Sequence, residues 1–317
     1  MINWIRSFKW IIQLYNLFKR KELLHNVPLY KKYGIKKKYY SCLSSEDFKH
    51  LDNPKPHLDR LDSAQELPKM EAFNALDKKI QLALLPWSEN GYAILENFFS
   101  EDEVERYNAE IQHLLDTNQV IWGYAQKIMF AIRQSKTLFE SATNPQLMRI
   151  LEMLVGKKMS IFQSINFLKG SQQKAHSDFV HMTTFPQNNI IAVWVALEDI
   201  TADSGPIHYY PSSHRLPLVL NANFDNIGTA FRNGKKDYCD YEDKIEQIIA
   251  EKQLKKEIFL PKKSDVLIWH ANLIHGGEPI QNPKSSRKSM VFHYYANDAI
   301  CFHEISERPA LRPVFSH

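Results

Sequence analysis

His176-Ser177-Asp178 follows an apolar run from Ser160 to Lys169, and His275 stands roughly a hundred residues later. Two imidazoles and one carboxylate form the facial triad that holds non-haem Fe(II) while leaving coordination positions open. A lone His-x-Asp occurs by chance in many chains, so the surrounding sequence must support it. Gly170 to Gln173 breaks the apolar run just before the motif, as expected for a strand that ends there. We therefore predict that His176, Asp178 and His275 bind a metal.

A basic residue supplies the second half of the prediction. Arg287 and Ser289 stand two apart at the start of a strand-like run, Ser289 to Tyr295, so both side chains can face the same way. A guanidinium grips a carboxylate through paired hydrogen bonds that a lysine ammonium does not reproduce. A metal triad followed by a carboxylate clamp predicts an oxygenase that uses 2-oxoglutarate as co-substrate.

Other metal-binding residue types are present near the motifs. Five further histidines are candidate ligands by composition alone, and we predict that they support the site or the core instead: His181, His208, His214, His270 and His293. The three cysteines, at positions 42, 239 and 301, are far apart and lack metal-site spacing. This argues against a zinc–thiolate site and a disulfide framework, and for a reducing compartment.

Further motifs stand in a fixed order around the histidines. Ala192–Ile200 contains a Trp-x-Ala-Leu strand, Ser204–Ile207 a Gly-Pro turn, and Pro211–His214 a short loop that ends in histidine. An apolar strand, Val266 to Trp269, leads to His275, and Asn90–Phe99 adds an opening strand. In these features, over roughly residues 85 to 300, the sequence resembles the phytanoyl-CoA dioxygenase family.

The resemblance implies a mainly β fold with flanking helices, the double-stranded β-helix (jelly-roll) barrel of cupin-like oxygenases. It also implies Fe(II), with 2-oxoglutarate and O2 as co-substrates. Matched motif to motif, Arg287 would clamp the distal carboxylate of 2-oxoglutarate, with Ser289 beside it. Trp194 would lie next to the co-substrate and Lys127 would reach it, although a solvated surface lysine is the alternative for Lys127.

The sequence departs from the family pattern at two places. Ser212 replaces a glycine, and Gly276-Gly277 stands where the family often has Gly-Ser, so we expect Ser289 to carry more of the co-substrate contact. Asp178 is retained, whereas halogenating relatives replace it, so hydroxylation with release of succinate and CO2 is favoured. The alternatives are a non-catalytic barrel that binds a ligand and a cupin isomerase that does not use 2-oxoglutarate.

Length and charge divide the 317 residues unevenly. We expect a basic segment at 1–40, a linker or loosely packed extension at 41–75, and an oxygenase domain at 76–317. An insertion at about 216–257, with a helix over Tyr241–Leu254, is expected to cover the barrel mouth and to select the substrate. Residues 1–40 hold ten Lys or Arg and one Glu, a net charge of +9, whereas the whole chain carries +4. A basic appendage on an acidic body indicates a partner for the appendage.

The first twenty residues predict an amphipathic helix. Aromatic and aliphatic residues recur at helical spacing, and polar or basic residues lie opposite them: Trp4, Phe8, Ile11, Tyr15 and Phe18 against Arg6, Lys9, Gln13, Asn16 and Arg20. Such a helix lies in a membrane interface or packs on the barrel or a partner, and both readings stay open. Its charges argue against a spanning helix and the missing cleavage site against a secretory signal. We expect a cytoplasmic enzyme with a small-molecule, lipid-like substrate, peripheral contact with the inner face of the membrane through 1–40, and no nucleic-acid partner.

Overall fold

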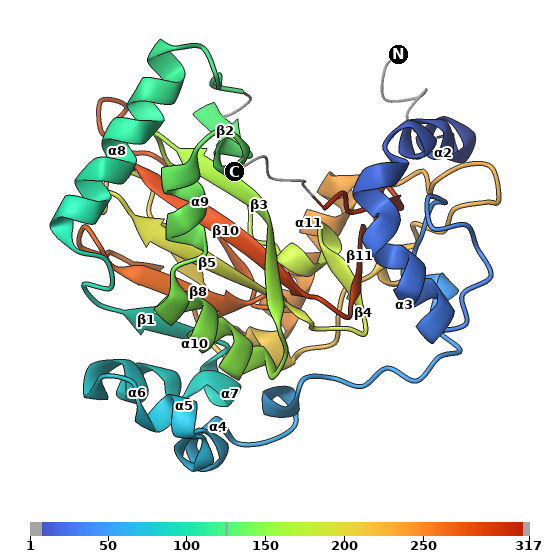
Figure 1. Cartoon of the computed structure of the whole chain (residues 1–317), viewed down its shortest axis with the longest axis horizontal. Coiled ribbons are helices and arrows are strands. Elements are labelled where there is room, and N and C mark those ends of the chain that lie inside the picture. Colours follow the sequence, from blue (N-terminus) through green and yellow to red (C-terminus); the bar gives the residue numbers. More distant parts are fainter. Residues whose placement is uncertain (1–7, 124–125, 313–317) are drawn as a thin grey trace.

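Antiparallel sheets form the centre of the computed structural model, which describes residues 8–123 and 126–312 (Figure 1). The largest sheet has the order β1-β8-β5-β10-β3-β2. Its strands are β1 (Tyr92–Leu95), β8 (Val266–His270), β5 (Ile190–Ala196), β10 (Ser289–Ala296), β3 (Met159–Phe167) and β2 (Lys127–Met129). Two three-stranded sheets complete the set: β7 (Glu257–Phe259), β6 (Ile207–Tyr209) and β9 (His275–Gly277), and then β12 (Arg308–Pro309), β11 (Ile300–His303) and β4 (Thr183–Phe185).

The central strands are buried on both faces, and their side chains alternate between two cores. On β5, Ile191 and Val193 join the core beneath the helices. Ala192 and Trp194 point the other way, into a core shared with Ile207 of β6 and other residues of the small sheet. Two sheets therefore face each other around an apolar interior. This is the predicted double-stranded β-helix with flanking helices.

Three helices cover the outer face of the large sheet (Figure 1). They are α8 (Glu101–Asp116), α9 (Lys136–Ala142) and α10 (Pro145–Val155). α8 begins with a capping box, in which Ser100 Oγ accepts from Glu103 N and the Glu103 carboxylate accepts from Ser100 N. The short helices α4 (Ser63–Glu66), α5 (Glu71–Asn74), α6 (Lys78–Leu84) and α7 (Trp87–Asn90) form a separate group at the lower edge of Figure 1.

Two predicted segments differ from the structure. His275 was expected at the end of the Val266–Trp269 strand, but a turn separates the two and His275 begins β9 in a different sheet. Residues 41–75 were expected to pack loosely, and that is wrong because Leu43, Leu58 and Leu67 are fully buried. These apolar residues hold the extension to the protein. They are so widely spaced in a mainly polar segment that the sequence shows no apolar pattern there.

The insertion contains the predicted helix, slightly earlier in the chain. α11 spans Tyr238–Glu251, and its N-cap is Asp237, whose side chain accepts from Cys239 N. The stretch before it, from Leu216, is mainly loop with one 3-10 turn at Asn221–Phe224.

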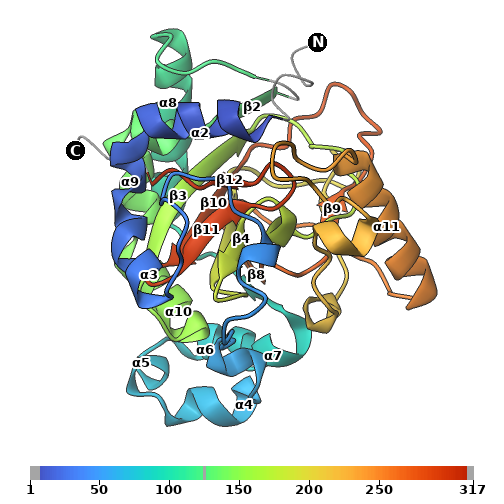
Figure 2. The ribbon, with the colours of Figure 1, turned by 90° about the vertical axis from the view of Figure 1, so that its right-hand side faces the viewer.

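The N-terminal segment lies beside the β12-β11-β4 sheet, apart from α8 (Figures 1 and 2). It comprises α2 (Lys9–Phe18), a 3-10 stretch η1 (Arg20–Asn26) and α3 (Val27–Lys32). The predicted helix is thus confirmed from Lys9 onward, whereas Trp4 and Arg6 lie outside the described residues. Within the described ranges, every helix is too short or too polar to cross a bilayer.

Candidate metal centre and co-substrate pocket

The three predicted metal ligands converge. One potential ligand atom from each of His176, Asp178 and His275 lies within 4.8 Å of the others. A backbone bridge joins the two histidines, since His176 N donates to His275 O at 2.8 Å and His275 N donates to His176 O at 2.9 Å. Asp178 Oδ1 lies 3.9 Å from His176 Nε2 and 3.7 Å from His275 Nε2. Residues far apart in sequence therefore form one compact donor set.

Backbone carbonyls set the tautomer of both histidines. His176 Nδ1 lies 2.8 Å from Lys174 O, and His275 Nδ1 lies 3.0 Å from Leu273 O. A carbonyl only accepts, so Nδ1 carries the proton and Nε2 keeps its lone pair. Burial also lowers the pKa of His176 to about 3. The ring is therefore neutral, which is the state in which histidine binds a metal.

One carboxylate oxygen of Asp178 faces the two histidines, and the other oxygen accepts a hydrogen bond from a neighbouring side chain. Its Oδ2 accepts a 2.8 Å hydrogen bond from Trp269 Nε1 and lies 3.5 Å from His293 Nε2. Burial favours a raised pKa for this carboxyl, but His275, His293 and His176 hold its pKa below the usual range. The carboxylate is therefore ionised. Trp269 was predicted only as part of a strand, although the alternation of side chains along that strand places it on the inner face with Leu267.

A cavity of about 70 Å³ adjoins the donor set, and Lys127, Trp194 and Arg287 line it. The Arg287 guanidinium lies 5.1 Å from the ring centroid of Phe167 and 5.7 Å from that of Trp194. Its Nε and Nη1 are buried without a hydrogen bond to any described residue. Burial lowers the pKa of Arg287 to about 10, so the group is still a cation at neutral pH. Its Nη2 donates only to Lys169 O, at 3.5 Å, and no carboxylate of the described residues forms an ion pair with it. Burying a guanidinium without such a partner costs free energy unless an anion occupies the cavity.

Lys127 faces the same cavity. Its Nζ lies 5.3 Å from the Phe167 ring centroid and 3.4 Å from Gln173 Oε1. Burial, and then the nearby Arg287, lowers the pKa of Lys127. The reading of Lys127 as a solvated surface residue is therefore wrong. Two cations and the unpaired indole Nε1 of Trp194 surround one small space, which fits a dicarboxylate beside a metal.

Two serines lie near this cavity. Ser289 is fully buried, and its Oγ has no hydrogen-bond partner among the described residues, but it does not line the cavity. Ser171 does line it. A Cβ at Gly277 would meet Ser171 Oγ at 2.6 Å, so Ser171 occupies the space of the side chain that the family often has at this position. This contact was not predicted, because Gly170–Gln173 indicated only the end of a strand.

The five other histidines contribute no atom to this group of potential ligand atoms. His293 contacts Asp178, and His208 Nδ1 pairs with a Glu278 carboxylate oxygen at 2.6 Å. His181 Nδ1 lies 3.3 Å from Nε2 of His303, a residue that sequence analysis did not single out. The remaining two, His214 and His270, lie elsewhere.

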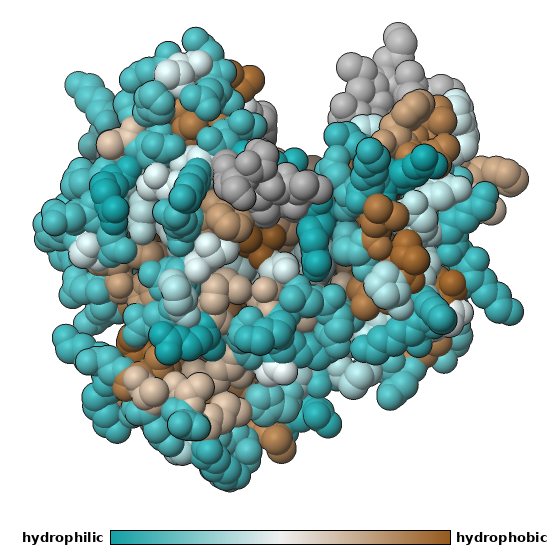
Figure 3. Space-filling model, viewed as in Figure 1, coloured by the Kyte–Doolittle hydropathy of each residue, from teal (hydrophilic) through white to brown (hydrophobic). Residues whose placement is uncertain are grey.

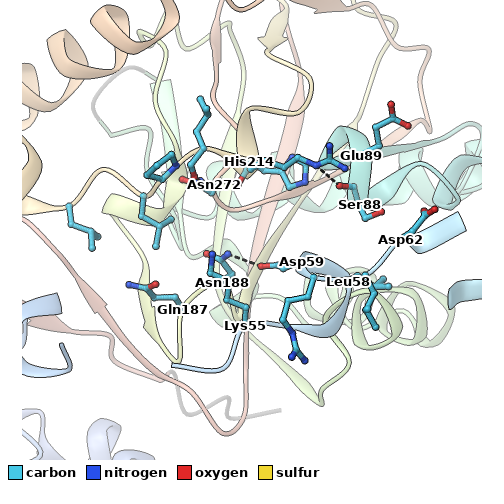
Figure 4. A pocket seen from close by; sticks show the side chains of 17 residues that line it. Lys55, Leu58, Asp59, Asp62, Ser88, Glu89, Gln187, Asn188, His214 and Asn272 are labelled. Carbon is cyan, nitrogen blue, oxygen red and sulfur yellow. Dashed lines mark hydrogen bonds between the residues drawn. The ribbon is translucent and has the colours of Figure 1, made fainter. Parts of the chain in front are cut away.

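His214 lines a different cavity, of about 940 Å³ (Figure 4). The His270 ring lies behind it, with its centroid 5.3 Å from that of His214. Asp59 accepts a 2.7 Å hydrogen bond from Asn188 Nδ2 and lies 3.4 Å from His270 Nε2. This cavity shares no lining residue with the one beside the metal ligands. The Asp59 carboxylate is already bound to Asn188 and lies beside His270. We therefore assign Asp59 a structural role, where the 41–75 extension meets the barrel.

A wider cavity of about 700 Å³ leads outward from the metal ligands. It shares His176, Asp178 and His293 with the small cavity. Its apolar lining includes Met129, Phe130, Phe162, Met182 and Leu311, and its polar lining includes Tyr15, Arg133, His181, His303 and Arg308. No described residue of the 216–257 insertion lines it, contrary to expectation. The insertion reaches the site from another side, where the Tyr238 ring lies 4.6 Å from that of His181.

Comparison with known proteins agrees with this arrangement. The family model described as Phytanoyl-CoA dioxygenase (PhyH) matches residues 87–289. The peroxisomal phytanoyl-CoA dioxygenase of Rattus norvegicus is 22% identical over 239 residues, covering 67% of each chain. The ectoine dioxygenase of Sphingopyxis alaskensis is 26% identical over 211 residues, covering 60% of this chain and 67% of that protein.

Solved structures share the fold. EctD from S. alaskensis, crystallised with 2-oxoglutarate and 5-hydroxyectoine, has a TM-score of 0.54 at 22% identity and covers 80% of this chain and 86% of its own. The carbocyclase SnoK from nogalamycin biosynthesis has a TM-score of 0.57 at 18% identity and covers 72% of this chain and 87% of its own. At these identities the likeness extends to the double-stranded β-helix and not to the reaction.

Proposed function

The chain belongs to the phytanoyl-CoA dioxygenase family and is a 2-oxoglutarate-dependent dioxygenase, and we propose that it hydroxylates a C–H bond of a small, lipid-like molecule. Succinate and CO2 are the other products. The observation that carries the proposal is the convergence of His176, Asp178 and His275 beside a cavity lined by the buried cation of Arg287 and the half-buried cation of Lys127. That arrangement provides for a metal and an anionic co-substrate in adjacent spaces.

The residues of this chain bind and orient, and the proposal requires no protein general base. His176, His275 and one oxygen of Asp178 would hold Fe(II), which, when bound, supplies the redox chemistry that couples 2-oxoglutarate oxidation to substrate oxidation. Arg287 and Lys127 would neutralise the co-substrate carboxylates in a site of low dielectric, where charge-assisted hydrogen bonds are strong. The apolar core around Trp194 keeps water from that side of the cavity.

The wider cavity supports a substrate with an apolar body and a hydrogen-bond acceptor. Ser306 N donates to His303 Nδ1 at 3.2 Å, so in the neutral ring His303 Nε2 carries the proton and donates to His181 Nδ1. His181 is then left with an Nε2–H donor beside the metal ligands. Burial lowers the pKa of both rings, which keeps them neutral. Phe162 and Met182 supply apolar surface in the same cavity.

Arg133 adds a cation at the outer part of this cavity. Its guanidinium stacks on Phe130 at 4.1 Å from the ring centroid, and it forms no ion pair with another described residue. A polar or anionic end group could therefore lie near Arg133 while the carbon chain extends toward the metal ligands.

The test is a succinate-release assay over panels of fatty acids, acyl thioesters, other lipids and amino acids, with Fe(II), 2-oxoglutarate and air. We expect stoichiometric succinate and a product heavier by one oxygen atom with a lipid-like substrate. The His275→Ala variant should give neither. Product formation without succinate would favour the isomerase, and ligand binding without turnover would favour the non-catalytic barrel.

A further inference from the structure

The apolar face of α2 points away from the protein. Trp10 is 61% exposed and Phe18 is 81% exposed, and both Leu14 and Leu17 are exposed beside them. These four residues recur at the spacing of one helix face. We refer to Trp10, Leu14, Leu17 and Phe18 as the α2 face.

The opposite side of α2 holds the helix to the protein through mainly polar contacts. Lys9 Nζ forms a 2.6 Å ion pair with Glu307, and Asn16 Nδ2 donates to Tyr40 O at 3.0 Å. Ile12 is fully buried between them. Lys9 and Asn16, two residues of the predicted polar side, therefore face inward, whereas Gln13 on that side is exposed. This orientation leaves the α2 face outward, where an ordinary surface helix carries polar residues.

Basic residues follow this face directly in the chain. Arg20, Lys21 and Lys31 are exposed and make no ion pair within the described ranges. The nearby carboxylate, Glu22, is already paired with Lys19 at 2.9 Å. Figure 3 shows apolar atoms gathered over α2 and the segment after it, with hydrophilic atoms around them. The surface thus combines exposed aromatic and aliphatic side chains with uncompensated positive charge.

The α2 face also adjoins the route to the metal ligands. Tyr15, on the same helix, lines the wider cavity. In Figure 3 the molecular surface is hollowed between the part that carries β2 and the part that carries α2. A molecule leaving a surface in contact with α2 would therefore meet this cavity.

We propose that the α2 face docks this protein on an anionic membrane surface. Trp10, Leu14, Leu17 and Phe18 would enter the interface, while Arg20 and Lys21 would contact acidic headgroups. Tryptophan, phenylalanine and leucine opposite basic groups form the combination that such interfaces bind. The charge excess favours a lipid surface over a protein partner. That the docked protein draws its substrate from the bilayer rests on the proposed function, whereas the docking itself does not.

The test is co-sedimentation of the full chain with vesicles of phosphatidylcholine alone and of phosphatidylcholine mixed with phosphatidylserine. We expect binding to the mixed vesicles, and salt should weaken it because the charge contribution is screened. Trp10→Ser with Phe18→Ser should lower the partition coefficient about tenfold or more. Arg20→Gln with Lys21→Gln should lower it roughly tenfold on mixed vesicles only.

A matched control changes one exposed apolar residue and two exposed basic residues on α6, which lies far from α2 in Figure 1. Leu82 is 56% exposed, and Lys78 and Lys79 are exposed beside it. Leu82→Ser with Lys78→Gln and Lys79→Gln should bind vesicles like the wild type. All variants should keep the wild-type unfolding midpoint and the same 2-oxoglutarate affinity, because none of these residues lines the pocket.

The proposal is overturned if the wild type stays in the supernatant with mixed vesicles, or if the α2 variants sediment like the control. Concentration-dependent self-association that Trp10→Ser abolishes, without vesicle binding, would instead assign the face to a protein interface. Vesicle binding without succinate release from any lipid would leave the docking intact and remove the proposed substrate class.

Discussion

Trp269 Nε1 donates a 2.8 Å hydrogen bond to Oδ2 of Asp178, and this contact leaves Oδ1 facing the two histidines. The carboxylate is thereby prepared to offer one oxygen to a metal while its charge is maintained. Such outer contacts orient metal ligands, and their loss typically weakens metal binding.

The first prediction concerns that contact. Trp269→Phe keeps most of the ring and removes the donor, so Asp178 loses its fixed orientation. We expect Fe(II) affinity to fall about 10- to 100-fold, measured by anaerobic titration. Trp87→Phe, which changes a buried indole outside the site, should titrate like the wild type. Equal Fe(II) affinities for the two variants would refute the orienting role of Trp269.

The second prediction concerns Arg287. Arg287→Ala leaves a carboxylate of the co-substrate desolvated and unpaired, which should cost about 2–5 kcal/mol of binding. The KM for 2-oxoglutarate should rise accordingly while Fe(II) still binds, and Arg287→Lys should recover only part of the loss. Lys288→Ala is the control, because that side chain is exposed on the opposite side of the strand. If both Arg287 variants keep the wild-type KM, the clamp lies elsewhere.

The third prediction tests the close approach of Gly277 and Ser171. A methyl group at position 277 would lie 2.6 Å from Ser171 Oγ and 3.0 Å from the backbone N of Gln172. Gly277→Ala should therefore raise the KM for 2-oxoglutarate. Adding Ser171→Gly should reverse part of that rise, since it removes the shortest of these contacts and leaves those with the backbone. Strictly additive effects in this double-mutant cycle would show that the two positions do not interact.

The fourth prediction is a pH dependence of stability. Burial lowers the pKa of His214 to about 3. In the unfolded chain His214 has a pKa near 6.5, so it is protonated there before it is protonated in the folded protein. Its contribution to the free energy of unfolding is therefore fully present above about pH 6.5 and is lost as the pH falls. Between about pH 7.5 and about pH 5 this histidine should contribute a loss of about 2 kcal/mol. Urea unfolding of His214→Asn should show a shallower pH slope than the wild type, whatever its absolute stability, and an unchanged slope would contradict the assignment.

The sequence predicted the elements that depend on local pattern. The strand that carries Trp194, buried throughout at Ile190–Ala196, and the strand after Arg287 both appear where the apolar runs of the sequence indicate them. The candidate metal ligands could also be picked out from the sequence, and the structure brings them together. Their residue types and order carry the chemistry, although the sequence alone could not show the backbone bridge that joins His176 to His275.

Contacts between distant segments were not predictable. Ser171 and Gly277 meet because a loop and β9 cross, and His303 reaches His181 from a separate strand. The orientation of α2 was hidden for a similar reason. Helical spacing identifies two faces, but only the partners of Lys9 and Asn16 show which face turns inward. The prediction that the 216–257 insertion covers the barrel mouth rested on its length alone. Other segments line the wider cavity.

The most direct test of the account is anaerobic addition of Fe(II) and then 2-oxoglutarate to the purified full chain. We expect a weak visible metal-to-ligand charge-transfer band in the wild type, because the metal ligands and the anion pocket lie side by side. The band should be absent in His176→Ala and should require more 2-oxoglutarate in Arg287→Ala. A folded wild-type protein that gives no band, or a band that persists unchanged in His176→Ala, would contradict the central claim.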